Sequence, residues 1–399
     1  MSTDHPSAAG AQTGRPDPPG VRQTRVVSQG DLEPRTWAAL DDLHARTGAP
    51  VTARRTWLQT WMDCFTSYQS FAVLVEDGDG AAGAALLAFR RRHGLTIVRS
   101  VGHAMSDQVR FPALDPAAAT QLAIGVAGAL QGLPRPWRLD VEQLPPDDPV
   151  VAALRRQLPW AEVRSGDPSP TVRFTRGRAL RSYISRNHHQ ASSRLVNRMR
   201  RADLATEVEV LSQPADIAAL LPDLERICRQ RDHQLGRLSQ FDDPEGGPFF
   251  HEVVRRLAEN GEVALTTLRL GSQLVAYVLS FVDGSVHRMW NTRFDPRLAQ
   301  FGPGRLAVDA ALGAALADES IVEFDWMRGD EPYKASTATD VVPAVRLVAW
   351  SSQLLGGAET DLRWAKARAR RRMRSVARVA CHVHPRHPRQ IVTRHHGRD

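Results

Sequence analysis

Apolar and polar residues alternate along this chain in short runs that mostly have the length of a β-strand or a globular helix. In the second half, residues 263–270, 274–282 and 286–294 form apolar runs of strand length, and the turn sequences LGSQL and VDGSV separate them. Turns that contain glycine between such runs indicate β-hairpins. The sequence therefore predicts three consecutive antiparallel strands in this region.

Helical patterns flank these strands. Apolar residues recur at helical spacing in 216–230, 248–260 and 304–317, and each of these segments is predicted to form a helix. Further strands are expected at residues 207–211, 321–326 and 343–350. The predicted order is one strand, two helices, three strands, one helix and two more strands, with an optional short helix between these last two.

The first half repeats this mixture of helices and strands. Trp57, Trp61 and Phe65 are spaced four apart, which places them on one helical face that is typical of core packing. Strands are expected at 70–76, 82–90, 95–101, 137–142 and 171–174, and helices at 34–46, 117–130 and 149–157. Helices that alternate with strands in this way indicate an α+β (mixed α/β) sheet domain.

Length suggests two such domains, because 399 residues exceed what one hydrophobic core usually organises. Each is expected to be a mixed, largely antiparallel sheet flanked by helices. The expected boundaries are a disordered extension at 1–30, a first domain at 31–175, a basic linker helix at 176–205, a second domain at 206–355, and a basic helix and tail at 356–399.

Positive charge is concentrated in two segments. Residues 362–399 contain twelve Arg or Lys and one Asp, a net +11, so the remainder carries −3 of the chain's total of +8. The segment 178–201 is also basic, and no acidic residue lies between Asp167 and Asp203. This helix is expected to bridge the domains, with its positive face beside a nucleotide phosphate or an anionic acceptor. A solvated face is the simpler alternative for both segments.

Cysteine and histidine usage indicates a reduced protein without metal. Cys64, Cys228 and Cys381 are far apart and lack metal-type spacing, and the tail histidines have no accompanying carboxylates or paired thiols. No signal-peptide pattern is seen, and no apolar run approaches the roughly 20 residues of a membrane span. The expected location is cytoplasmic, with peripheral contact at the inner face of the membrane as the alternative that the basic tail offers.

The segment from Trp290 to Lys334 carries the strongest functional signal. The sequence FGPGRL places a glycine turn before a helix, and free N–H groups at the positive end of a helix suit a pyrophosphate. The polar loop after the next strand then holds Asp325, Glu331 and Tyr333 within ten residues. An anion cradle beside groups that handle protons indicates a transferase with a phosphate-bearing donor.

These motifs resemble the acyl-CoA N-acyltransferase (GNAT) superfamily. NTRFDPRLAQFGPGRL and FDWMRGDEPYK are similar to two segments of its CelD-like acetyltransferase branch, and LTTLRLG followed by QLVAYVLSF also resembles that branch. The branch is distantly related to Fem-type aminoacyltransferases, which place two such domains in tandem. This chain departs from the pattern at Phe301-Gly302, where Ser usually precedes Pro-Gly, and at Ala335-Ser336, near a position where Trp is common.

The resemblance implies two tandem GNAT-like domains and acyl-CoA, normally acetyl-CoA, as co-substrate without a metal. The donor would bind at the glycine turn and at the late end of the preceding strand. The candidate donor-binding residues are Gly302, Pro303, Gly304, Arg305 and Trp290, and Asn291 lies near the expected thioester carbonyl.

Proton transfer and acceptor binding have separate candidates. Asp325 or Glu331 could accept a proton from the amine, and the resemblance implies that Tyr333 protonates the departing thiolate. Lys334 is one of two lysines in an arginine-rich chain, which favours a need for a compact ammonium group. The structural alternatives are that Asp325 caps a turn and that Lys334 pairs with Asp330. Weaker candidates for acceptor binding are Ser106, Asp107 and Gln108.

The leading hypothesis is an N-acyltransferase that moves an acyl group from acyl-CoA to an amine of a small molecule, sugar or polysaccharide precursor. One alternative is a Fem-type transferase that uses aminoacyl-tRNA on a cell-wall precursor, as the basic segments would allow. The other is a non-enzymatic protein whose basic tail docks on an anionic membrane or nucleic acid.

Overall fold

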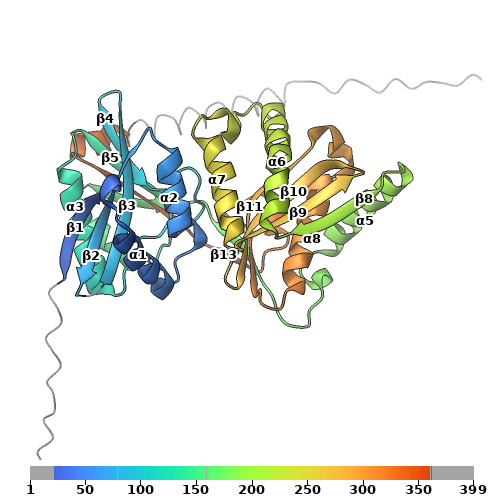
Figure 1. Cartoon of the computed structure of the whole chain (residues 1–399), viewed down its shortest axis with the longest axis horizontal. Coiled ribbons are helices and arrows are strands. Elements are labelled where there is room, and N and C mark those ends of the chain that lie inside the picture. Colours follow the sequence, from blue (N-terminus) through green and yellow to red (C-terminus); the bar gives the residue numbers. More distant parts are fainter. Residues whose placement is uncertain (1–21, 79, 159, 360, 362–399) are drawn as a thin grey trace, which may run out of the picture.

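The computed structural model describes residues 22–78, 80–158, 160–359 and 361, and shows two domains side by side (Figure 1). Each domain is built on a seven-stranded sheet. The first sheet has the order β1-β2-β3-β4-β5-β14-β6. Its strands are β1 (Gln23–Ser28), β2 (Gln69–Asp77), β3 (Gly80–Arg92), β4 (Leu95–Ser100), β5 (Trp137–Leu144), β14 (Val345–Trp350) and β6 (Ala161–Ser165).

The second sheet has the order β13-β7-β12-β11-β10-β9-β8. Its strands are β13 (Asp340–Val342), β7 (Ser169–Arg173), β12 (Glu323–Asp325), β11 (Val286–Phe294), β10 (Gln273–Asp283), β9 (Val263–Leu270) and β8 (Thr206–Leu211). Within the described residues each sheet has one parallel pair, β4 with β5 and β11 with β12, among antiparallel neighbours. The two sheets therefore share one topology.

Helices cover both faces of each sheet. In the first domain, α1 (Pro34–Thr47) and α2 (Arg55–Cys64) pack on one face, and α3 (Pro116–Gln131) and α4 (Pro149–Gln157) on the other. In the second, α6 (Pro214–Gln234) and α7 (Gly246–Glu259) cover one face and α8 (Pro303–Ala317) the other. A central strand between two helical layers should be apolar throughout. The run LVAYVLSF of β10 meets this condition and is buried along its length.

One hydrophobic core joins the two domains. The predicted stripe of α2 is buried, with Trp57 and Trp61 at 0% exposure, and the Trp57 ring meets aromatic rings of the second domain edge to face. Its ring centroid lies 5.2 Å from that of Phe249, 5.5 Å from Phe281 and 5.3 Å from Trp290. The expectation that this stripe is core is confirmed, and the core it serves belongs to both domains.

The two sheets exchange strands, which the expected boundaries did not anticipate. β7 follows β6 directly but pairs with β12 and β13 of the second sheet. β14 follows β13 directly but inserts between β5 and β6 of the first. The expected boundaries at 175 and 206–355 therefore cut through both sheets. Strand propensity gives no information on which sheet a strand joins, because that choice depends on long-range pairing.

Two further expectations need correction. Residues 23–28 are not part of a disordered extension: β1 is an antiparallel edge strand on β2, and its sequence QTRVVS is missed because only Val27 is buried. The basic helix α5 (Arg186–Arg201) does not bridge the domains. It packs against the 3₁₀ segment η5 (Pro296–Phe301) before α8, on the side of the second domain away from the first (Figure 1). The expected tail beyond residue 361 lies outside the described residues.

Candidate functional site

The two parallel strands of the second sheet separate shortly after they meet. β11 pairs with β12 only from Val286 to Arg288, and the backbone N–H of Trp326 then donates to Pro170 O of β7. Within the described part of the chain, the β11 edge from 289 to 294 therefore faces no strand on this side. A one-residue bulge at Trp290 adds to the distortion, because Met289 and Asn291 lie opposite consecutive residues of β10. This geometry leaves backbone donors and acceptors of β11 available to an extended ligand.

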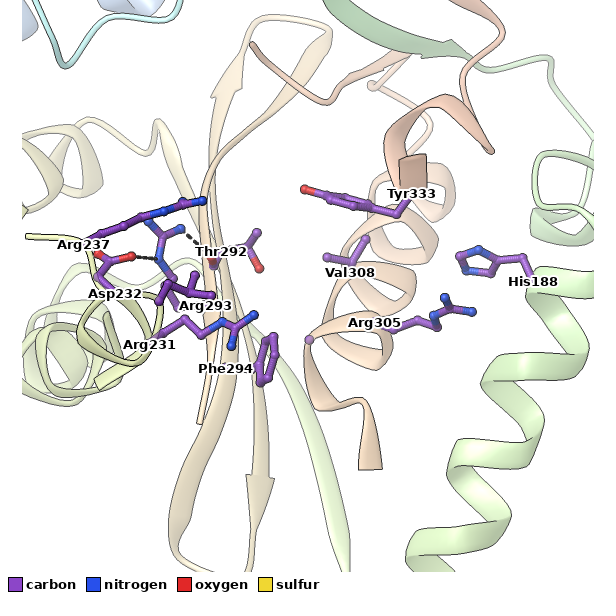
Figure 2. Close-up of a pocket in the computed structure, with 12 residues that line it drawn as sticks. His188, Arg231, Asp232, Arg237, Thr292, Arg293, Phe294, Arg305, Val308 and Tyr333 are labelled. Atoms are coloured by element: carbon purple, nitrogen blue, oxygen red, sulfur yellow. Dashed lines mark hydrogen bonds and ion pairs between the residues drawn. The ribbon is translucent and has the colours of Figure 1, made fainter. Parts of the chain in front are cut away.

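A cavity of about 370 Å³ lies beside this open edge (Figure 2). Residues of β11 and α8 form two of its walls, and the short helix α9 (Pro332–Ala335), α5 and the C-terminal end of α6 supply the rest. The lining residues are Thr292, Arg293, Phe294, Gly304, Arg305, Val308, Tyr333, His188, Arg231, Asp232, Leu235 and Arg237. Of the residues expected to bind the donor, Gly304 and Arg305 are in this cavity, and Tyr333 joins them from the expected catalytic set.

The start of α8 offers fewer free amides than the sequence suggested. Gly302 has a left-handed backbone (φ +59°), ends η5, and donates its N–H to Ala299 O at 3.0 Å. Arg305 N–H donates back to Gly302 O at 3.1 Å, and Pro303 has no N–H. Only the N–H of Gly304 has no partner among the described residues. The expected row of open amides is therefore corrected to one, at the positive end of the helix.

Glycine is required at residue 304 by close packing. A Cβ atom there would lie 2.7 Å from Cδ1 of Phe294, whose ring forms the opposite wall of the cavity. Gly304 therefore lets the first turn of α8 approach Phe294 of β11 closely.

The cavity carries an excess of positive charge. Of the described residues that line it, Asp232 alone is acidic, and it pairs with Arg293 at 3.3 Å. The Arg231 guanidinium lies 4.5 Å from the centroid of the Phe294 ring. The side chains of Arg237 and Arg305 have no carboxylate partner within the described residues. A pocket with uncompensated guanidinium groups is suited to a polyanionic ligand.

His188 closes the cavity from α5. Its Nε2 lies 2.7 Å from Oδ1 of Asp309 on α8, and Asp309 also accepts a hydrogen bond from Ser192 Oγ at 2.6 Å. These contacts fasten α5 to α8, so the basic helix serves as an outer wall of the cavity. The sequence singled out this helix for its charge but assigned it a different place.

Tyr333 projects into the cavity from α9. Its ring meets Trp326 edge to face at 5.9 Å, and Figure 2 shows the hydroxyl directed across the cavity toward the side that holds Arg237. Burial, together with the nearby Glu331 carboxylate, raises the pKa of Tyr333 above its usual value despite the opposing charge of Arg293. The phenol is therefore protonated at neutral pH and can donate a proton or a hydrogen bond.

Lys334 and Glu331 lie outside the cavity and hold the loop that carries Tyr333. The Lys334 ammonium is 5% exposed, donates to Arg328 O at 2.6 Å and pairs with Glu331 at 3.0 Å, not with Asp330 as the structural alternative had it. Burial raises the pKa of Glu331, but its hydrogen bond with Lys334 and the charges of Lys334 and Arg237 outweigh burial and leave the pKa lowered. A carboxylate held in this way is a poor base.

Asp325 also has a structural position. Its Oδ2 accepts hydrogen bonds from Gln108 Nε2 and Arg288 Nη1, both at 2.7 Å, and its Oδ1 accepts from the N–H of Met327 at 2.8 Å. The Asp325 side chain is 2% exposed and does not line the 370 Å³ cavity beside β11. Its contacts do not support the expected role as general base. They agree with the alternative of a turn cap, and they link the two domains.

Trp290 and Asn291 lie near the bulge, but their side chains have structural partners. Trp290 Nε1 donates to Met105 O at 3.2 Å, and its ring stacks on Phe250 and Phe281. Asn291 Oδ1 accepts from the Tyr277 hydroxyl at 2.8 Å. Neither side chain lines the cavity, so any role in donor binding would belong to the backbone.

The three residues expected at the acceptor lie between the domains. Ser106 Oγ is buried and accepts from Trp57 Nε1 at 2.8 Å. Asp107 and Gln108 line a second cavity, of about 420 Å³, between the domains. Burial raises the pKa of Asp107 to about 6 despite its ion pair with Arg328. Their contact with an acceptor stays a prediction.

In the first domain, the helix that matches α8 is α3, and its start already carries a carboxylate. The side chain of Asp115 caps α3 by accepting the N–H of Ala118 at 2.8 Å, and Asp115 forms two hydrogen bonds with Arg22. A carboxylate at this helix start repels an anionic ligand. The start of α8, where the Gly304 N–H has no partner among the described residues, is therefore the better suited of the two helix starts to an anion.

Sequence reasoning missed the arginines of the cavity outside α8. Arg231 and Arg237 come from the end of α6 and the turn after it, Arg293 comes from β11, and in an arginine-rich protein nothing local distinguishes them. Their common feature is spatial, since α6 ends beside the open edge of β11. Among the described residues no group of three or more His, Cys, Asp or Glu could hold a metal ion, and no helix is long and apolar enough to cross a membrane.

Comparisons with known proteins agree with this geometry. Residues 186–335, from the start of α5 to the end of α9, match the family model of an acetyltransferase (GNAT) domain. The crystal structure of FemX aligns over 79% of this chain and 96% of that chain, with a TM-score of 0.53 and 10% identity. A conserved protein of unknown function from Bacteroides thetaiotaomicron aligns over 79% and 98%, with a TM-score of 0.50 and 12% identity. A search of curated proteins finds no significant match.

The matched segment contains every residue that lines the 370 Å³ cavity, with His188 near its beginning and Tyr333 near its end. The structural similarities, at low identity, concern the fold. The chain is thus an acyltransferase related to the GNAT superfamily, with a two-domain α+β fold in which residues 186–335 of the second domain match the GNAT family model.

Proposed function

We propose that this protein transfers an acyl group, acetyl being the simplest, from acyl-CoA to an amine of a small molecule, sugar or polysaccharide precursor. The observation that carries the proposal is the open edge of β11 beside the Gly304 N–H and the guanidinium groups of the cavity. A CoA thioester combines a diphosphate with an extended arm that contains amides. The cavity offers matching groups for both.

The residues present fit such a donor. The diphosphate would lie at the start of α8, where Gly304 offers its N–H and Arg305 and Arg231 supply charge. The amides of the arm would pair with the unpaired backbone of β11 between 289 and 294, as an added strand does at a sheet edge. The thioester would then lie toward Tyr333, with the bulge at Trp290 on the same strand.

The chemistry is a nucleophilic acyl substitution. The amine nitrogen attacks the thioester carbonyl carbon, the new C–N bond forms, and the C–S bond breaks. The nitrogen loses one proton to solvent, and the departing sulfur takes one proton from the Tyr333 hydroxyl, which solvent then restores. A backbone N–H near the bulge would polarise the carbonyl oxygen. The described contacts leave Asp325 and Glu331 poorly placed to remove the proton, so no general base is assigned.

The second candidate function is aminoacyl transfer from tRNA, as the basic helix favours. The outer surface of α5 presents Arg186, Arg194, Arg200 and Arg201, all exposed, beside the wall formed by His188. Such a face could contact the phosphates of a nucleic acid that delivers its acyl group to the same cavity. An anionic surface docked through the basic tail stays a prediction, because that tail lies outside the described residues.

Calorimetric titration of the full chain with CoA and acetyl-CoA tests the leading proposal. We expect saturable binding of both, and an increase of about tenfold in Kd for Arg305→Gln, since one charge-assisted contact contributes roughly 1.4 kcal/mol. Arg255→Gln, on the outer face of α7, is the matched control and should leave Kd unchanged.

Filter retention of tRNA at several salt concentrations tests the alternative in parallel. Lack of CoA binding at millimolar concentration, together with salt-sensitive retention of tRNA that is lost in Arg194→Gln/Arg200→Gln/Arg201→Gln, would favour aminoacyl transfer over the leading proposal.

A further inference from the structure

We propose that the acceptor is an amine that also bears an anionic group, a carboxylate or a phosphate, and that Arg237 binds this group across the cavity from Tyr333. The inference rests on the proposed function and deepens it by naming the class of acceptor. Its evidence is the position, the support and the pairing state of one arginine.

Arg237 is held in place by the C-terminal turn of α6. The N–H of Leu235 donates to Asp232 O, the N–H of Gly236 to His233 O, and the N–H of Arg237 to Asp232 O, with distances of 2.9–3.0 Å. Gly236 has a left-handed backbone (φ +67°), which reverses the chain after the helix. These bonds fix the backbone from which the guanidinium group enters the cavity.

The cavity has two ends with different arginines. In Figure 2, Arg237 and Tyr333 lie toward one end, whereas Phe294, Arg231 and Arg305 lie toward the other, where α8 begins. Arg237 also lies near enough to Glu331, two residues before Tyr333, for its charge to help lower the pKa of that carboxyl group. In the proposed function the donor diphosphate lies at the start of α8. Arg237, at the other end, is therefore available to an anionic group of the acceptor.

Arg237 also differs from its neighbour in its pairing. Arg293 lies close by but is already bound to Asp232 at 3.3 Å and to Thr292 O at 2.8 Å. The side chain of Arg237 forms no ion pair with a carboxylate among the described residues; Arg237 lines the cavity and is exposed to solvent. A free guanidinium can form two parallel hydrogen bonds with a carboxylate or a phosphate.

Such an anchor would serve transfer directly. Binding the anionic end of the acceptor at Arg237 would hold its amine on the side of the cavity that Tyr333 faces, which turns an encounter in solution into a positioned reaction. A neutral amine would lack this anchor. Selectivity between the two kinds of amine should therefore appear mainly in KM.

Paired acceptors test the inference on the full-length protein with acetyl-CoA as donor. Each pair joins an anionic amine to a neutral analogue: γ-aminobutyrate with its amide, and phosphoethanolamine with ethanolamine. For at least one pair we expect the anionic amine to have a kcat/KM about tenfold or more above that of its analogue. The better member of the two anionic amines then distinguishes a carboxylate from a phosphate.

Three variants complete the test. Arg237→Gln should raise KM for the anionic amine about tenfold, leave kcat within about twofold and leave the Kd of CoA unchanged. Arg237→Lys should partly reverse this increase in KM, because an ammonium group keeps the positive charge but cannot form the two parallel hydrogen bonds of a guanidinium. The exposed Arg255→Gln on α7, outside the cavity, is the control and should behave as wild type.

Several outcomes would overturn the inference. One is equal use of the two members of both pairs, or no turnover of any anionic amine while CoA binds. Another is a preference that survives in Arg237→Gln. A third is weaker CoA binding in that variant, which would assign Arg237 to the donor. Lack of CoA binding in the wild type would instead reject the proposed function itself, so the two failures are distinguishable.

Discussion

Tyr333 and Lys334 are adjacent in the sequence, but their side chains point to different environments. Tyr333 enters the donor cavity with its phenol, whereas Lys334 turns into the protein and binds Arg328 O and Glu331. On a short helix, consecutive side chains point about 100° apart, so one motif can supply a reacting group and its support. The tyrosine is the candidate for chemistry, and the lysine is a positioning residue.

Replacing Tyr333 by Phe should lower kcat about 100-fold with little change in the Kd of CoA, because the variant removes only the proton donor. The measurement is steady-state transfer of acetyl groups together with calorimetric titration of CoA. Tyr183→Phe is the control, since its hydroxyl contacts the backbone of Thr175 outside the cavity. A Tyr333→Phe enzyme with unchanged kcat would show that the sulfur leaves without help from this phenol.

Replacing Lys334 by Met should destabilise the fold by about 1–3 kcal/mol, because the buried Arg328 carbonyl and the Glu331 carboxylate lose their partner. Transfer activity should fall with it, since Tyr333 loses its support. Urea unfolding at pH 7 measures the first effect. Lys334→Arg should not restore stability, because a guanidinium is larger than the space beside Gly329, where a Cβ atom would already crowd the Lys334 Nζ at 3.0 Å. Full stability in either variant would contradict this account.

Of the residues that line the cavity, the sequence singled out those that belong to a local motif and missed those that do not. Gly304, Arg305 and Tyr333 lie in the two segments that carried the resemblance, and they line the cavity. Asp325 was chosen from its place at a strand end, but Gln108 from the other domain reaches its carboxylate. Such a contact spans 217 residues of chain and leaves no trace in local spacing.

At the scale of elements, the junction of β11 with α8 builds the site. β11 provides an open edge and a bulge, and α8 begins where Gly304 allows contact with Phe294. The hairpins from β9 to β11 and the helix α8 were predicted from turn chemistry and periodicity, because both signals are local. β1 was not predicted, since it is largely exposed. Strands were expected near β7 and β14, but not that each would join the sheet of the other domain.

Two glycines of α8 allow a matched test of this junction. Gly304→Ala should raise the Kd of CoA about tenfold, because the added methyl group meets the Phe294 ring at 2.7 Å and narrows the cavity. Gly313→Ala lies in the same helix, where the new methyl group would make an ordinary contact with Leu180 at 3.5 Å. It should stabilise the protein by about 0.5–1 kcal/mol and leave CoA binding unchanged. Equal effects of the two variants on CoA binding would contradict the assigned role of Gly304.

At the scale of the whole molecule, the two domains are bound together more tightly than a tandem arrangement requires. Their helices share one core around Trp57, and each sheet contains a strand from the other half of the chain. Asp325 also accepts a hydrogen bond from Gln108 of the first domain. Arg54 adds an ion pair from the first domain to Asp283 of β10, and Asp283 also accepts from Arg288 at 2.8 Å. Partial unfolding of one domain would therefore expose core and unpaired strands in the other.

This connectivity predicts one cooperative unfolding unit, which two distant leucines can test. Leu122 on α3 packs only in the core of the first domain and Leu312 on α8 only in that of the second, and both are buried. Either leucine replaced by Ala should cost about 2–5 kcal/mol. In a single unit, each variant lowers hydrogen-exchange protection equally in peptides from β3 and from β10, because both strands exchange only when the whole molecule opens. If Leu122→Ala instead weakened β3 and spared β10, the domains would unfold separately, and the shared core and exchanged strands would contribute far less to stability than their contacts indicate.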